Sequence, residues 1–320
     1  MLGVSIVLYR SPIEGVLATL RGLAAQTVAV VEVVVHANAA SESEIDSLRA
    51  TLLGGVPGLT RLAVTGSESN LGFCTAHNLA LARLFGAGCD AVVVLNPDLV
   101  LDQDALAELT SAETDLPQPA LLGPLLELAD PVDLRPTGRI DTTGIRWAPG
   151  ARHLDARQGD PMVDLPTASV RVDGISGACL YVSRTAYDRI TGASGEFFDE
   201  DFVAYREDAE LAYRAGLLGI PSYLVPAARG VHARRLRGTT RGGDPAIDLL
   251  GVRNRFLIAF KYGVRRPGGL ASGLARDVVV VAAVVTRERS SLPGLWQAWR
   301  LRHRMRAKGR QVRAFDASRK

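Results

Sequence analysis

Asn96-Pro97-Asp98 places a carboxylate where it could bind a ligand. The tripeptide follows the apolar run Ala91 to Leu95, which is typical of a strand buried on both faces. Pro97 forces the chain out of the sheet, so we expect Asp98 at the carboxyl edge, where open α/β sheets bind ligands. Because Asn, Pro and Asp favour turns in any protein, an ordinary turn without a functional role is the alternative.

A second candidate is the acidic pair Glu207-Asp208, which begins a predicted helix from about Glu207 to Leu218. A carboxylate at such a position could act as a general base and remove the proton from an attacking hydroxyl group. Acidic residues in a first helical turn also complement the helix dipole, so the pair has an ordinary structural explanation as well. Glu210 could belong to the site or face solvent.

The elements that would position these residues are those of an α/β protein. Short β-branched runs alternate with amphipathic stretches, which predicts βαβ units and a mostly parallel, Rossmann-like sheet flanked by helices. Capping-box patterns mark two helix starts, Ser11 with Glu14 before the first and Ser41 with Glu44 before the second. The expected strands are Val4 to Tyr9, Val30 to Val35, Arg61 to Thr65 and Ala91 to Leu95, with a loop and helix from Asn70 to Phe85.

The middle of the chain is less regular. Between Pro117 and Pro166 the pattern weakens into short strands and turns, which we interpret as an insertion lying against the sheet. A small-residue turn and a strand are expected from Gly174 to Ser183, and a further strand from Tyr223 to Val225. His232 would follow that strand after a turn rich in Pro and Gly.

In order and spacing, four segments resemble the family 2 glycosyltransferases with the GT-A fold, especially their rhamnosyltransferase-like branch. The resemblance covers roughly residues 3 to 240. Any one segment is a weak signal, whereas the ordered set is specific. The segments are Asn70-Leu71-Gly72-Phe73 with His77-Asn78, then Asn96-Pro97-Asp98, then Phe198-Asp199-Glu200-Asp201-Phe202 with Tyr205-Arg206-Glu207-Asp208-Ala209-Glu210-Leu211, and finally Val231-His232.

The resemblance assigns roles to these residues. Asp98 and His232 would hold a divalent ion, Mg²⁺ or Mn²⁺, which neutralises the leaving nucleoside diphosphate. Asn96 would contact the nucleotide ribose. Asp208 would be the catalytic base of an inverting transfer, with Glu207 as the alternative member of the pair.

Donor binding is expected from residues of these segments and of neighbouring loops, which are Tyr9, Asn38, Asn70, Gly72, Asn78, Asn96, Asp98 and Arg234. The sequence departs from the family at one place. An Asp-Asn pair usually follows the second strand, whereas this chain has Ala37-Asn38, which puts recognition of the base in doubt. Arginines of a Gly-containing loop could bind phosphate oxygens or simply be solvated, and they are Arg234, Arg235, Arg237 and Arg241.

The charge distribution divides the chain near residue 250. The formal net charge of +3 conceals a balance of −11 before that point, from 20 basic and 31 acidic residues, and +14 after it, from 17 basic and 3 acidic residues. We therefore expect a GT-A domain over residues 1–250 and a basic helical extension over residues 251–320. An odd set of three widely spaced cysteines fits a reducing cytoplasm and argues against a disulfide framework.

The basic extension is expected to meet an anionic membrane. Trp296 and Trp299 among arginines suit a helix at a headgroup surface, and no base-reading motif supports nucleic acid as the partner. The longest apolar run of the extension, Val278 to Thr286, is much shorter than the ~20 residues of a membrane span. No export signal is visible, so we expect a cytoplasmic protein at the inner face of the cell membrane.

The function expected from the sequence is that of an inverting, metal-dependent glycosyltransferase. It would move a sugar to a cell-envelope glycan or a polyprenyl-diphosphate-linked acceptor. In the resembled branch the sugar is rhamnose, and the donor would then be dTDP-rhamnose. One alternative keeps the fold and changes the sugar to galactofuranose, glucose or an N-acetylhexosamine. A second alternative, suggested by Ala37, is a module that binds a nucleotide or glycan without turnover.

Overall fold

The computed structural model describes residues 1–59, 61–234, 245–263 and 267–317. The strands are β1 (Leu2–Leu8), β2 (Val30–Asn38), β3 (Leu62–Ser67), β4 (Ala91–Leu95), β5 (Leu99–Leu101), β6 (Leu121–Ala129), β7 (Pro136–Thr142), β8 (Ile145–Ala148), β9 (Arg152–Asp155), β10 (Val170–Val172), β11 (Cys179–Ser183) and β12 (Ser222–His232). The helices are α1 (Ile13–Ala24), α2 (Glu42–Gly55), α3 (Gly72–Gly86), α4 (Ala105–Asp115), α5 (Arg184–Ser194), α6 (Glu207–Leu217), α7 (Pro245–Tyr262), α8 (Leu270–Thr286) and α9 (Leu292–Ala317), with short 3₁₀ helices η1 (Glu200–Phe202) and η3 (Arg289–Ser291).

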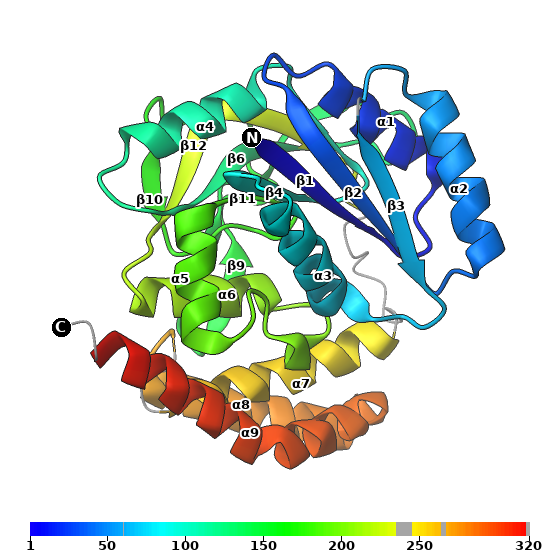
Figure 1. The fold of residues 1–320 in the computed structure, drawn as a ribbon. Coiled ribbons are helices and arrows are strands. Elements are labelled where there is room, and N and C mark those ends of the chain that lie inside the picture. The colour runs from blue at the N-terminus through cyan, green and yellow to red at the C-terminus, as the bar shows by residue number, and fades with distance from the viewer. Residues whose placement is uncertain (60, 235–244, 264–266, 318–320) are drawn as a thin grey trace.

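One large sheet organises the molecule (Figure 1). Its main path runs β10-β12-β6-β11-β4-β1-β2-β3. The neighbours β4, β1, β2 and β3 are parallel, and so are β12 and β6, whereas β11 runs antiparallel between β4 and β6. The expected α/β class with a mostly parallel central sheet is confirmed.

Helices cover both faces of this sheet. Because side chains of a strand alternate between its faces, Val93 of β4 packs with α1, α2 and α4, while Val92 and Val94 pack with α3, α5 and α6. Both faces are therefore buried, which explains why β4 reads as a continuous apolar run.

Two expectations about strands are corrected by the structure. The region between Pro117 and Pro166 is not only an insertion, because β6 lies inside the main sheet between β11 and β12. The strand expected at Tyr223 to Val225 is an eleven-residue strand, β12, that continues to His232 through a register shift between Val225 and Arg229. Pro226 lies in that shift, where a missing N–H is tolerated.

The two capping-box expectations have opposite outcomes. At α2 the box is present, since the Ser41 hydroxyl accepts the N–H of Glu44 and the Glu44 carboxylate accepts the N–H of Ser41. At α1 the expectation is wrong, because the helix is capped by Pro12 without a side-chain bond. The Ser11 hydroxyl instead accepts the N–H of Tyr9 at 3.3 Å.

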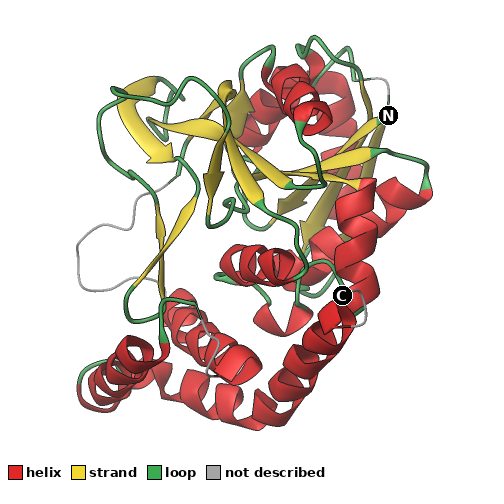
Figure 2. Cartoon of the chain, turned by 90° about the vertical axis from the view of Figure 1, so that its left-hand side faces the viewer, coloured by secondary structure: helices red, strands yellow, loops and turns green. Residues whose placement is uncertain are grey.

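The C-terminal helices α7, α8 and α9 gather at one side of the molecule, at the bottom of Figures 1 and 2. Leu257, Ile258 and Tyr262 of α7 belong to the core around α3, α5 and α6. Helix α9 crosses α7 closely, because a Cβ on Gly294 would lie only 2.7 Å from the carbonyl oxygen of Leu249. Within the described ranges, no helix is long and apolar enough to cross a membrane. The division of the chain near residue 250 stays a prediction.

Candidate active site

The predicted site residues begin at one edge of the sheet. Strands β1 and β4 pair in parallel, with Ile6 beside Leu95, so Tyr9 and Asn96 leave the sheet at the same edge. Asn38 ends the neighbouring parallel strand β2 at this edge. Tyr9 is exposed there, whereas Asn38 is buried. The sheet thus brings together residues that lie far apart in the sequence.

Asp98, His232 and Asp141 form a chain of contacts at this edge. His232 Nε2 lies 3.3 Å from Asp98 Oδ1, and its Nδ1 lies 2.8 Å from Asp141 Oδ2. Burial acts to lower the pKa of His232, but hydrogen bonds and charges of Asp141 and Asp98 outweigh burial and raise the pKa to about 9. His232 and Asp141 are buried, whereas the Asp98 side chain is 40% exposed. Asp98 therefore remains open to a ligand, and His232 is oriented toward it.

Arg234 extends this polar chain. Its Nη1 donates to Asp155 Oδ2 at 2.5 Å, and its Nε lies 3.5 Å from Asp141 Oδ1. Its charge also acts on Asp208. Arg234 is thus the one arginine of the predicted loop that the structure connects to the site; Arg235, Arg237 and Arg241 lie outside the described residues.

The acidic pair lies at the first turn of α6, and its two members differ in environment. Asp208 Oδ2 accepts the N–H of Gly177 at 3.1 Å, Oδ1 accepts that of Ala209 at 2.7 Å, and the side chain is partly exposed. Burial raises the pKa of Asp208 despite these bonds. Glu207 is buried and its Oε2 has no hydrogen-bond partner in the described part of the chain. Burial and the charge of Asp208 hold the pKa of Glu207 well above its ordinary value.

The loop before α6 is conformationally strained. Val203, Tyr205 and Arg206 have positive φ angles of 63°, 67° and 67°, which cost non-glycine residues energy. Helix α7 holds this loop, because the side-chain amide of Asn254 donates to three carbonyl oxygens between residues 202 and 205 at 2.7 to 2.9 Å. The position of Asp208 therefore depends on α7.

Asn38, Asn70 and Gly72 build the loop that enters α3. Asn38 Oδ1 accepts the N–H of Leu71 at 3.0 Å, and its amide donates to the Gly72 carbonyl at 3.3 Å. Asn70 Oδ1 accepts the Gly72 N–H at 2.9 Å. Gly72 has φ +79°, and a Cβ there would lie 2.7 Å from the Val203 carbonyl oxygen. These residues shape the loop, while their contact with a donor stays a prediction.

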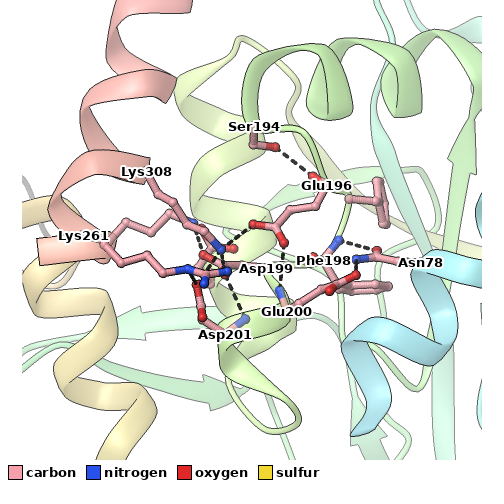
Figure 3. Close-up of polar contacts among 12 residues, drawn as sticks. Asn78, Ser194, Glu196, Phe198, Asp199, Glu200, Asp201, Lys261 and Lys308 are labelled. Atoms are coloured by element: carbon pink, nitrogen blue, oxygen red, sulfur yellow. Dashed lines mark hydrogen bonds and ion pairs between the residues drawn. The ribbon is translucent and has the colours of Figure 1, made fainter. Parts of the chain in front are cut away.

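Asn78 lies on α3 and binds the acidic-aromatic segment before α6. Its amide donates to the Phe198 carbonyl at 2.9 Å, and its Oδ1 accepts the Phe198 N–H at 2.9 Å. A further bond of 3.1 Å reaches Glu200. Figure 3 shows this contact beside η1. The side chain therefore connects α3 with η1 and with the segment before it.

A buried ion cluster joins α6 to α7 and α9, and Figure 3 shows its members Asp199, Lys261 and Lys308. Lys261 Nζ lies 2.6 Å from both Asp199 Oδ2 and Glu210 Oε1, and all three side chains are at most 1% exposed. Lys308 of α9 lies 2.5 Å from Asp199 Oδ1, and Arg214 Nη2 lies 3.1 Å from Glu210 Oε2. Glu210 is therefore neither solvated nor in contact with Asp98, and instead binds α6 to the C-terminal helices.

Comparisons with solved structures decide the fold. GalNAc-T7, crystallised with UDP, GalNAc and Mn²⁺, superposes over 82% of this chain and 48% of its own with a TM-score of 0.60 and 16% identity. A mannosyltransferase from Pyrobaculum calidifontis, in complex with GDP-Man and Mn²⁺, matches 99% of this chain and 86% of its own at TM-score 0.53 and 16% identity. The chain has the GT-A glycosyltransferase fold.

One relative in sequence points to a branch within the GT-A enzymes. The chain is 32% identical over 206 residues to an N-acetylglucosaminyl-diphospho-decaprenol L-rhamnosyltransferase of Mycobacterium tuberculosis. The alignment covers 59% of this chain and 62% of the relative's own length. No protein-family model matches the chain. The expected resemblance to GT-A glycosyltransferases, with a rhamnosyltransferase among the relatives, is confirmed.

The side chains of Asp98 and His232 fit a divalent cation. Asp98 offers a partly exposed carboxylate, and His232 points Nε2 at it while Asp141 binds the other ring nitrogen. Such a carboxylate behind a metal-ligating histidine is a common supporting arrangement. Across the described ranges, no group of three or more His, Cys, Asp or Glu side chains is placed to hold a metal ion. Two protein ligands suit Mg²⁺ or Mn²⁺, which take further ligands from water and phosphate oxygens.

Sequence reasoning missed Asp141 and Asp155. Asp141 lies near the end of β7 and Asp155 ends β9, in the region where the strand pattern is weak. Neither belongs to a recognised segment, and Ile140-Asp141-Thr142-Thr143-Gly144 looks like a turn. A usable signal was an acidic residue at the end of each short strand, although such positions are common in turns.

Proposed function

We propose that this chain is an inverting, metal-dependent glycosyltransferase that moves rhamnose from a nucleoside-diphosphate donor, dTDP-rhamnose, to a glycan acceptor on polyprenyl diphosphate. The observation that carries the proposal is the chain of contacts from Asp98 through His232 and Asp141 to Arg234, whose charge acts on Asp208. The name of the 32% identical relative supports the sugar and the acceptor. The proposal also places the enzyme at the cytoplasmic face of an anionic membrane.

Asp208 would take the proton from the acceptor hydroxyl. Its pKa is raised by burial, which makes it a stronger base than an ordinary aspartate. The N–H groups of Gly177 and Ala209 fix its carboxylate, and the charge of Arg234 acts on it. Burial and the charge of Asp208 raise the pKa of Glu207, which favours Asp208 as the charged member of the pair.

Asp98 would hold a divalent cation together with His232, whose Nε2 must first lose the proton that its raised pKa retains. When bound, the cation would neutralise charge on the leaving diphosphate. His232 is kept in position by Asp141, and the Asp98 backbone is fixed because its carbonyl accepts the N–H of Ala233 at 2.9 Å. Tyr9 and Asn96 leave the sheet at the same edge, where they would contact the donor nucleotide.

The test is a screen of nucleotide sugars with Mn²⁺ and Mg²⁺ and a short-chain polyprenyl-diphosphate acceptor. We expect turnover of dTDP-rhamnose only with a divalent cation, and an inverted anomeric configuration by NMR. Asp208→Asn should lower turnover by roughly 10²- to 10⁴-fold with donor affinity nearly unchanged, because only proton removal is lost.

The matched control is Asp188→Asn, which changes an exposed aspartate on α5 and should leave turnover as in the parent. Turnover of a different nucleotide sugar would contradict the donor. Donor binding with no turnover of any sugar would show that the chain is a binding module and not an enzyme. Turnover by the Asp208→Asn variant equal to that of the parent would exclude Asp208 as the base.

A further inference from the structure

Helix α8 presents an apolar surface to solvent along most of its length. Only Gly273 and Val284 of its seventeen residues are buried. At 3.6 residues per turn, four exposed or half-exposed side chains fall within about 60° of one another on one face. Val278 is the most exposed of them, at 70%. We call this face the α8 stripe, and it consists of Leu274, Val278, Val281 and Val285.

Aromatic residues follow in the next helix. Trp296 and Trp299 lie three residues apart in α9, so they point to the same side of that helix, and they are 62% and 51% exposed. The guanidinium carbon of Arg302 lies 3.9 Å from the Trp299 ring centroid. Large rings with an apolar body and a polar N–H are favoured where hydrocarbon meets headgroups.

The charges around this surface are almost all positive. Between residues 274 and 315 the sequence has ten Lys and Arg residues against two acidic residues, Asp277, which pairs with Arg255, and Glu288. The exposed ones include Arg287, Arg289, Arg300 and Arg310. A second copy of the chain would bring these like charges together, which disfavours a symmetric dimer through this face. Anionic phosphate headgroups complement them.

We propose that the α8 stripe, with Trp296 and Trp299, docks on an anionic lipid bilayer. The helix would lie in the plane of the surface, with the valines at the acyl boundary, the tryptophans among the headgroups and the arginines at the phosphates. Burial of the stripe would remove apolar area that otherwise faces water, and the arginines add a salt-sensitive attraction.

The docking surface is connected to the active site. Arg255 of α7 donates to Asp277 of α8 at 2.8 Å and to the carbonyl oxygens of Gly273 and Ala151 at 3.3 Å, which joins α8 to the turn between β8 and β9. Strand β9 ends at Asp155, the partner of Arg234. A bilayer against α8 would therefore lie next to the hairpin that lines the site, as a lipid-linked acceptor requires; this last step rests on the proposed function.

The test uses the full chain with Val278→Glu and Val281→Glu together. Both side chains are exposed, so the fold should be retained, which circular dichroism and the melting temperature check. Vesicles of phosphatidylcholine mixed with phosphatidylglycerol, and of phosphatidylcholine alone, are the probes. The matched control is Val132→Glu, which places a charge at a 91% exposed valine far from α8 in the sequence.

We expect the parent and the Val132→Glu variant to co-sediment with the anionic vesicles, with a blue shift of tryptophan emission, and the double variant to bind roughly tenfold more weakly or worse. Equal binding by the double variant would overturn the role of α8. A parent that ignores vesicles, or that is a dimer which the double variant dissociates, would overturn the bilayer as partner.

Donor hydrolysis, measured without vesicles, separates this inference from the proposed function. The double variant should hydrolyse donor as the parent does, because α8 carries no residue of the site. Vesicle binding without any turnover would leave the docking surface intact and contradict the glycosyltransferase.

Discussion

Lys261→Met tests whether the buried ion cluster holds the C-terminal helices on the catalytic helix. The substitution keeps an unbranched side chain of similar length and removes the charge. Lys261 is 1% exposed and contacts two carboxylates, of Asp199 and Glu210, that are fully buried. Removal of one partner from a buried ion pair costs about 3 to 5 kcal/mol. Because Lys308 and Arg214 remain as partners of these carboxylates, we expect the lower end, about 3 kcal/mol.

The loss should depend on pH. Burial acts to raise the pKa of Asp199 and of Glu210, but the charges of Lys261 and its basic neighbours outweigh burial and hold both pKa values below the ordinary range. These carboxylates therefore stabilise the parent above their unfolded pKa of about 4, and this contribution is lost as pH falls through the lower folded values. In the variant the charge of Lys261 is missing and both pKa values rise relative to the parent, so protonation relieves part of the penalty as pH falls. The difference in stability should be largest near neutral pH and shrink toward about pH 4.

Urea unfolding at several pH values, followed by circular dichroism, measures this difference. Arg304→Met is the control, since Arg304 pairs with Asp201 at 2.7 Å from a 60% exposed position and such pairs contribute at most about 1 kcal/mol. Adding Asp199→Asn to Lys261→Met should recover part of the loss, because one unpaired buried charge disappears. A Lys261→Met variant as stable as Arg304→Met at neutral pH would refute the reasoning.

Three further predictions concern the site and the helix packing. Asp98→Ala should abolish metal-dependent binding of a nucleoside diphosphate in calorimetry, and unchanged metal dependence would remove Asp98 from the site. Glu207→Gln should keep turnover within about tenfold of the parent, since burial and the charge of Asp208 favour its neutral form, and a loss as large as that of Asp208→Asn would make Glu207 the base. Gly309→Ala should destabilise the fold by about 1 to 3 kcal/mol in thermal unfolding, because its Cβ would overlap the carbonyl oxygen of Lys261, whereas Gly216→Ala, with open space around it, should not.

The sequence predicted the elements whose local pattern and tertiary environment agree. Strand β4 was predicted residue by residue, because it is apolar on both faces and bounded by Asp90 and Pro97. Strand β6 was missed because it contains Gly123 and Pro124, which argue locally against a central strand. Pro124 has no N–H group to donate. Whether a strand needs an N–H at that position depends on its neighbours in the sheet, and the local sequence carries no information about those neighbours.

The roles predicted for the site residues stay predictions, but their proximity has a structural reason. Asp98 lies beside His232 because β5, which begins directly after Asp98, pairs antiparallel with the end of β12, and Arg234 follows that strand. Asp141 was not found, because its role arises only from the pairing of β7 with β6, which carries it to His232. Asn78 was assigned to the donor, yet the structure shows it bonded to the segment before α6, and a donor contact stays a prediction.

The strained loop before α6 determines when the candidate site can form during synthesis of the chain. Asp208 leaves the ribosome well before Asn254, Lys261 and Lys308, whose side chains hold its loop and helix. At about 5 to 20 residues per second, the stretch from Asp208 to Lys308 takes roughly 5 to 20 s to synthesise. Before α7 emerges the sheet can already form, whereas the loop lacks the three bonds from the Asn254 amide that hold it. The loop is therefore fixed only after α7 has been synthesised, which protease sensitivity of this loop in stalled nascent chains would reveal.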